Sequence, residues 1–198
     1  MVIDGSSLSL TDAKGTKGFG PVGTRTQRVQ GLMVNSALAV SGDGTPLGLI
    51  DQTFWSRDPT LALTKAEQMI RNQGRSFEDK EPAEIVRCAE RSIERLAREG
   101  VRAWVVVDRV ADNRDILQAL SKANCVFTVR AHYNRPLSQD GPLREELADQ
   151  PCLGRYEIEV GRTGNRAARR AVLELRAKTV ELVFRSRPNK PTERLSLT

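Results

Sequence analysis

Two aspartates stand directly after short apolar segments, in positions suited to metal or acid–base chemistry. The stretch from Trp104 to Val107 is continuously apolar and leads straight into Asp108, and a shorter apolar strand precedes Asp4. Apolar runs rich in β-branched residues are typical of strands buried on both faces, so each carboxylate is expected at a strand end on the rim of a sheet. An aspartate in such a place can hold a metal ion, or it can simply cap the helix that follows. Both interpretations stay open for Asp108.

The elements needed to position the two aspartates can be read from the pattern of the chain. Alternating and apolar segments predict strands over 1–10, 30–40, 47–55, 104–108 and 125–130. Helical spacing predicts helices over 61–74, 81–100, 111–123 and 142–150. Residues 11–26 are rich in glycine but lack the spacing of a phosphate-binding loop, so we expect a flexible connection without a binding role. The first three strands are expected to form an antiparallel meander that turns at 41–44.

The carboxyl-terminal part of the chain has a different character. Period-two alternation over 155–160, 168–176 and 179–184 predicts antiparallel strands with one wet face, and 194–198 begins another. Residues 160–198 hold 10 Lys and Arg against 3 Asp and Glu, a net charge of +7, whereas the whole chain carries +6. A basic segment beside an acidic site favours a polyanionic partner, with nucleic acid first. The alternative is a solvated strand face that happens to be rich in arginine.

Composition excludes several classes of protein. The chain has 198 residues, which suits one domain with a sub-domain. Its cysteines at 88, 125 and 152 lack zinc-site spacing, and His132 is the single histidine. No stretch is long and apolar enough to span a membrane, and no secretory signal opens the chain. We therefore expect a cytoplasmic protein.

Three antiparallel strands followed by helix, strand, helix, strand is the order of an RNase H-like fold, a mixed α/β sheet with flanking helices. In that architecture the first and fourth strands lie side by side, so Asp4 and Asp108 are expected to be neighbours. Two close carboxylates are stabilised by a cation between them, and oxygen ligands favour Mg²⁺ or Mn²⁺. Paired ions of this kind activate a water or a 3′-hydroxyl in phosphodiester transfer.

Several motifs in this order resemble the catalytic domain of bacterial DDE transposases of the cut-and-paste insertion-sequence class. Asp4-Gly-Ser-Ser-Leu-Ser resembles the family's first catalytic strand. Asp108-Arg-Val-Ala-Asp resembles its Asp-Arg-Glu-Ala-Asp signature, and only Val110 departs. Phe-Thr-Val-Arg130 resembles the strand that follows, and Phe-Glu-Asp-Lys-Glu81 fits the start of the long helix.

The resemblance implies an RNase H-like catalytic core over 1–153 and an inserted antiparallel β sub-domain over 154–198. It implies that Asp4 and Asp108 are catalytic ligands of Mg²⁺ or Mn²⁺. Arg130 is expected to contact DNA phosphate, and Arg135 in the following segment is placed with it. The expected partners are double-stranded DNA, at transposon ends and target, and a second copy of the protein in a homodimer on DNA. The expected compartment is the bacterial cytoplasm, at the nucleoid.

One feature of the family has no counterpart here. Its third acid lies in a Tyr-x-x-Arg-x-x-x-Glu run, and the surroundings of Glu193 do not match it. The sequence therefore predicts a transposase fragment that lacks the third catalytic acid and the amino-terminal DNA-end-binding domain of relatives, with little activity alone. The alternative is a remnant that binds DNA without chemistry. A general RNase H-like nuclease is a weaker alternative, because a minimal nuclease needs no inserted basic strands.

Overall fold

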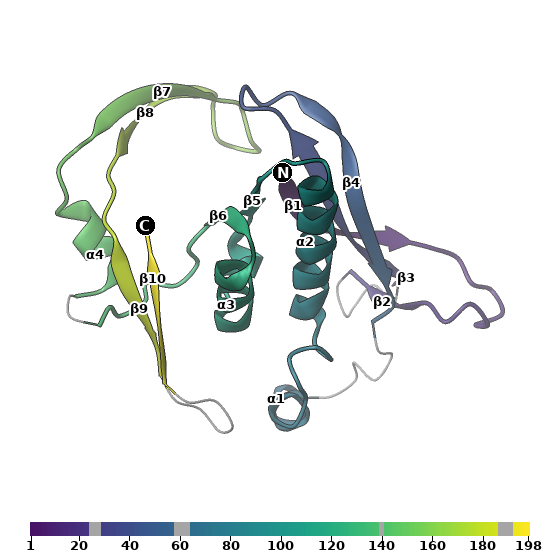
Figure 1. Ribbon diagram of the computed structural model, residues 1–198. Coiled ribbons are helices and arrows are strands. Elements are labelled where there is room, and N and C mark those ends of the chain that lie inside the picture. Colours follow the sequence, from purple (N-terminus) through teal and green to yellow (C-terminus); the bar gives the residue numbers. More distant parts are fainter. Residues whose placement is uncertain (24–28, 58–63, 139–140, 186–191) are drawn as a thin grey trace. The chain divides into compact units, whose positions relative to one another are not determined.

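The chain forms two units, Met1–His132 and Tyr133–Thr198 (Figure 1). The computed structural model describes residues 1–23, 29–57, 64–138, 141–185 and 192–198. The boundary falls earlier than the division expected at 153/154, because Leu137 already pairs with Leu182 of the second unit. Among the described residues, no helix is of the length and apolarity that a membrane crossing needs.

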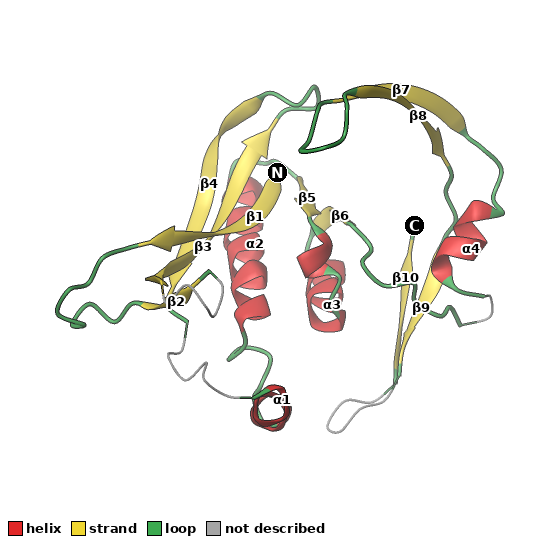
Figure 2. Ribbon diagram, turned by 180° about the vertical axis from the view of Figure 1, so that it is seen from behind, coloured by secondary structure: helices red, strands yellow, loops and turns green. Residues whose placement is uncertain are grey.

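The first unit contains a mixed sheet flanked by helices (Figure 2). Its strands are β1 (Val2–Ser9), β2 (Gly20–Val22), β3 (Val29–Val40), β4 (Pro46–Trp55), β5 (Ala103–Val107) and β6 (Cys125–Val129). The order is β2-β3-β1-β5-β6, and β4 pairs with β3. The expected antiparallel meander of β1, β3 and β4 is confirmed, and β5 and β6 run parallel to β1.

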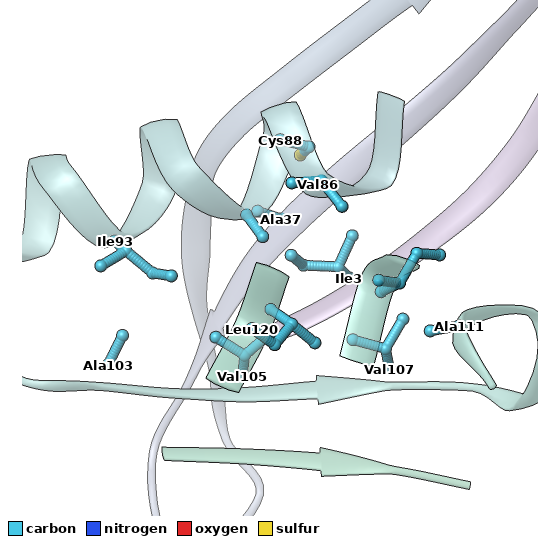
Figure 3. Packing of buried hydrophobic residues seen from close by; sticks show 12 residues of the cluster. Ile3, Ala37, Val86, Cys88, Ile93, Ala103, Val105, Val107, Ala111 and Leu120 are labelled. Carbon is cyan, nitrogen blue, oxygen red and sulfur yellow. The ribbon is translucent and has the colours of Figure 1, made fainter. Parts of the chain in front are cut away.

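The helices of the first unit are α1 (Lys65–Gln73), α2 (Glu81–Arg98), the 3₁₀ helix η1 (Arg109–Ala111) and α3 (Arg114–Lys122). Of these, α2 and α3 cover one face of the sheet. Acidic residues in the first turn of α2 and arginines in its last turn complement the helix dipole. The predicted apolar stripe of α2 packs inward through Val86 and Ile93, in one cluster with Ile3 of β1 and Val105 of β5 (Figure 3).

The prediction that the strand before Asp108 is buried on both faces is wrong. Ala103, Val105 and Val107 are buried under the helices, whereas Trp104 is 60% exposed and Val106 is 36% exposed. The strand alternates because α2 and α3 pack on one face of the sheet, as their shared core cluster shows. A continuous apolar run does not distinguish a strand covered on both faces from one covered on a single face.

Two boundaries also differ from the expectation. The glycine-rich stretch 11–26 contains β2, which pairs with the start of β3. The helix expected over 111–123 is observed as α3, which begins at Arg114 because Asn113 caps it, and Ala111 instead ends the short helix η1 that Asp108 caps. The helix expected over 61–74 is observed as α1, and residues 61–63 lie outside the described part of the chain.

The second unit is built from hairpins. It contains α4 (Leu143–Ala148), β7 (Gly154–Val160), β8 (Arg169–Leu175), β9 (Val180–Phe184) and β10 (Glu193–Leu197). β7 pairs antiparallel with β8, and β9 with β10, as the alternation predicted. Alternate residues of β9 are buried, whereas both faces of the β7–β8 hairpin are largely exposed.

Candidate functional site

The register between β1 and β5 brings the two predicted aspartates to one place. Val2 pairs with Val106, and Ile3 pairs with Val107, in a parallel arrangement. Asp4 and Asp108 are the next residues on these strands, and the backbones of neighbouring strands lie about 4.8 Å apart. Both aspartates are exposed. The predicted neighbourhood of Asp4 and Asp108 is confirmed.

The backbone orients each carboxylate. Asp108 is the N-cap of η1, and its Oδ1 accepts a hydrogen bond from the Val110 N–H at 2.9 Å. Asp4 Oδ1 accepts from the Gly5 N–H at 2.9 Å. The capping interpretation of Asp108 is therefore confirmed. It does not exclude a metal-binding role, because the cap engages one of the two carboxylate oxygens.

Arg130 lies beside the two aspartates. Val107 pairs with Val129, and the Arg130 N–H donates to the Val107 carbonyl at 3.2 Å, so the ladder between β5 and β6 continues to the rim. Arg130 is exposed. Side chains alternate along a strand, and this alternation places Asp4, Asp108 and Arg130 in one row on the face opposite α2. Asp108 and Arg130 directly follow β5 and β6, whereas Asp4 lies within β1, so the expectation that Asp4 ends its strand is wrong. Two acids and one base at adjacent positions on three neighbouring strands suit a metal-bridged phosphate.

Arg135 has different surroundings from Arg130. It belongs to the second unit, where its guanidinium carbon lies 5.0 Å from the centre of the Tyr133 ring and 5.3 Å from that of Phe184. These are cation–π distances. The side chain is half-buried and packs within its own unit. The structure thus brings three of the four predicted residues into one row and gives Arg135 a packing role.

Asp112 was not singled out for a role by its sequence context. It is only 6% exposed, and its Oδ2 accepts a hydrogen bond from the His132 N–H at 2.7 Å. This bond ties the segment after β6 to the turn between η1 and α3. Asp112 therefore helps to hold the backbone beside Arg130. The sequence alone does not show whether an aspartate is buried and accepts a hydrogen bond from a backbone N–H or is exposed to solvent.

The donor chemistry of the row fits a divalent cation. Mg²⁺ is commonly held by one or two carboxylates, several waters and substrate phosphate oxygens. Asp4 and Asp108 supply such carboxylates at neighbouring positions. Within the described ranges, no group of three or more His, Cys, Asp or Glu side chains has the placement to hold a metal ion. The pair fits as part of a metal site whose remaining ligands are water and phosphate.

A cleft opens next to this rim, within the first unit. It has a volume of about 970 Å³, and its wall includes Asp4 and Asp108 together with residues of β3, β4, α1 and α2. An ion pair between Arg57 and Glu81, at 3.0 Å, lies in its wall. Asn35 and Trp55 also line it, and sequence analysis missed both. The signal in the sequence that could have pointed to Asn35 is a polar asparagine in the middle of a largely apolar strand.

Comparison of the chain with models of protein families and with curated proteins found no match. Its function must therefore be inferred from its own residues. Three features of the chain bear on it: the neighbouring positions of Asp4 and Asp108, the row that includes Arg130, and the charge distribution.

Proposed function

We propose that this chain provides the catalytic core for DNA transposition, through metal-dependent phosphodiester hydrolysis and strand transfer at transposon ends. The proposal includes an RNase H-like fold and membership of the bacterial DDE transposases that the motifs resemble. The observation that supports it most strongly is the parallel pairing of Ile3 with Val107, which makes Asp4 and Asp108 neighbours. The antiparallel β1-β3-β4 meander with β5 beside β1 agrees with that fold.

In this proposal Asp4 and Asp108 hold Mg²⁺ or Mn²⁺. When bound, the ion activates a water or a 3′-hydroxyl and stabilises the leaving oxygen of the phosphodiester. The Val110 N–H keeps the Asp108 carboxylate oriented through the helix cap. Arg130 binds a phosphate oxygen of the DNA strand next to the ion. Asp112 holds the segment that follows Arg130 through its bond to the His132 N–H.

The proposed partners are double-stranded DNA and a second copy of the protein on that DNA. Residues 160–198 carry a net charge of +7, which favours a polyanion. The complete catalytic centre of this class also needs a third acid. The resemblance puts that acid on a helix that follows the inserted strands.

A nicking assay tests the proposal. Supercoiled plasmid is incubated with the chain in Mg²⁺, in Mn²⁺ and in EDTA, with the variants Asp108→Asn and Asp149→Asn. Asp149→Asn is the matched control, because it makes the same change at an exposed position at the end of α4. Because the third acid is missing, we expect only weak metal-dependent nicking, which Asp108→Asn abolishes and the control retains. Nicking that both variants retain equally would refute the assignment of Asp108.

A second candidate function is DNA binding without chemistry. It is favoured by the basic carboxyl-terminal region, together with the absence of a three-acid group within the described ranges. Under this alternative the chain binds DNA in a salt-sensitive manner, nicks nothing in any metal, and binds equally well as Asp108→Asn. The same protein samples, assayed for binding and for nicking, distinguish the two functions.

A further inference from the structure

The cleft in the first unit contains two buried hydrogen-bond donors without partners. Asn35 is 2% exposed and lines the cleft, and its Nδ2 has no acceptor among the described residues. The indole Nε1 of Trp55 lines the same cleft and likewise lacks an acceptor there. Buried donors in folded proteins are almost always satisfied by protein, water or ligand. Two such donors on one wall mark a place where an acceptor binds.

The side chains of Asn35 and Trp55 lie on the opposite face of the sheet from the side chains of Asp4, Asp108 and Arg130. Asn35 pairs with Gly5, whereas Asp4 pairs with Ser36, so Asn35 and the Asp4 side chain belong to opposite faces. Trp55 pairs with Met33, which shares the face of Asn35. The cleft and the row of Asp4, Asp108 and Arg130 share Asp4 and Asp108, which line one edge of the cleft.

Gly5 makes room for the Asn35 amide. A Cβ atom at Gly5 would lie 3.0 Å from the Asn35 Oδ1, closer than ordinary van der Waals contact. The amide therefore packs directly over the backbone that follows Asp4. The pairing of β3 with β1 fixes the position of the Asn35 amide. Groups that bind a ligand need rigid support of this kind.

The lining selects the kind of acceptor. Six acidic residues and four basic ones line the cleft, an excess of negative charge that disfavours an anion. Apolar side chains complete the wall, among them Ile3, Met33 and Ile85. Neutral N–H donors set among apolar walls suit an uncharged ring that carries carbonyl or ring-nitrogen acceptors.

We propose that this cleft binds a nucleobase, with the Asn35 amide and the Trp55 indole N–H donating hydrogen bonds to its acceptors. A nucleobase is flat and uncharged and carries acceptors on its edges. The cleft volume of about 970 Å³ lies in the range of sites that enclose small organic ligands. The two donors, Asn35 and Trp55, are not among the residues proposed to hold the metal ion.

Tryptophan fluorescence tests the proposal directly. The chain has two tryptophans, so Trp104→Phe leaves Trp55 as the sole reporter. Thymidine and adenosine are titrated as uncharged probes, and ribose is the uncharged control without a base. We expect saturable changes in Trp55 emission with the nucleosides and none with ribose. Asn35→Ala should weaken binding about tenfold. Ser36→Ala, a change to the neighbouring residue on the opposite face, should have no effect.

A second measurement guards against misfolding of the Asn35 variant. Trp55→Phe keeps an aromatic side chain but removes the indole N–H together with its pyrrole ring, and nucleoside-induced shifts in its melting temperature report binding without fluorescence. The shift should be smaller than in the parent chain. No saturable response to either nucleoside at about 10 mM would overturn the proposal. So would an equal response to ribose, or full affinity in both donor variants.

Discussion

Ile3 of β1 lies opposite Val107 of β5 in a parallel strand pair, and this one register makes neighbours of two aspartates that are distant in sequence. The next residue on each strand is Asp4 or Asp108, and Arg130 follows at the end of β6. A shift of β1 by one residue would send Asp4 to the helix face, because side chains alternate along a strand. The buried Ile3 therefore fixes the position of the neighbouring carboxylate.

The capping and metal-binding roles of Asp108 can be separated by two substitutions. Asparagine caps helices as well as aspartate does, so Asp108→Asn should change the free energy of unfolding by only a few tenths of a kcal/mol. Asp108→Ala removes the acceptor for the Val110 N–H and should cost about 1 kcal/mol. Urea unfolding of both variants checks this. An equal loss of stability in both would contradict the cap.

The connection between β7 and β8 is predicted to contact DNA phosphates. Arg162 and Arg166 are exposed in the connection and Arg169 is exposed at the first position of β8, and within the described ranges no acid pairs with them. Replacing all three by alanine should weaken DNA binding and reduce the slope of log K against log salt by about 3 if each contacts one phosphate. Fluorescence anisotropy with a duplex at several salt concentrations measures this slope.

The strands of the same β7–β8 hairpin offer a matched control. Arg155 pairs with Glu174 at 2.8 Å and Arg170 pairs with Glu157 at 3.2 Å, so their charges are partly neutralised within the hairpin. Replacing these two arginines by alanine should change the slope of log K against log salt less per residue than replacing Arg162, Arg166 and Arg169. An equal or larger effect per residue would place the DNA contact on the strands.

The cysteines are predicted to differ in reactivity. Burial, and then the negative charge of Asp51, raise the pKa of the Cys88 thiol, and burial raises the pKa of Cys125. Cys152 is exposed. Because the thiolate is the reactive form, a thiol reagent at neutral pH should modify Cys152 first and Cys88 last. Labelling followed by peptide mass spectrometry gives the order, and early labelling of Cys88 would contradict it.

The raised pKa of Cys88 also makes stability depend on pH. The unfolded chain loses this proton at lower pH than the folded chain, so the free energy of unfolding should fall as the pH rises above about 8.5. Below that pH the contribution is fully present. Urea unfolding from pH 7 upward measures the fall, and Cys88→Ala should make it shallower. An unchanged fall in Cys88→Ala would assign it to other groups.

The acidic pair could be predicted from the sequence because each aspartate follows a short apolar run and strand order is a coarse property of the chain. The end of the first strand could not, because β1 continues past Asp4 to Ser9. The exposure of Trp104 could not be predicted, since β-branched and aromatic runs look the same whether one face or both are covered. The packing of Arg135 between Tyr133 and Phe184 depends on a contact between distant residues. Asn35 was missed because what marks it is a buried amide N–H without an acceptor, and only the three-dimensional structure shows this.

The central claim is that Asp4 and Asp108 together hold one divalent cation. Titration of Mn²⁺, followed by the loss of its free-ion electron paramagnetic resonance signal, tests it on the parent chain, Asp4→Asn, Asp108→Asn and the double variant. We expect each single substitution to weaken Mn²⁺ binding about tenfold or more, and the double variant to bind little more weakly than either single one, because both side chains serve the same ion. Unchanged Mn²⁺ affinity in both single variants would contradict the claim.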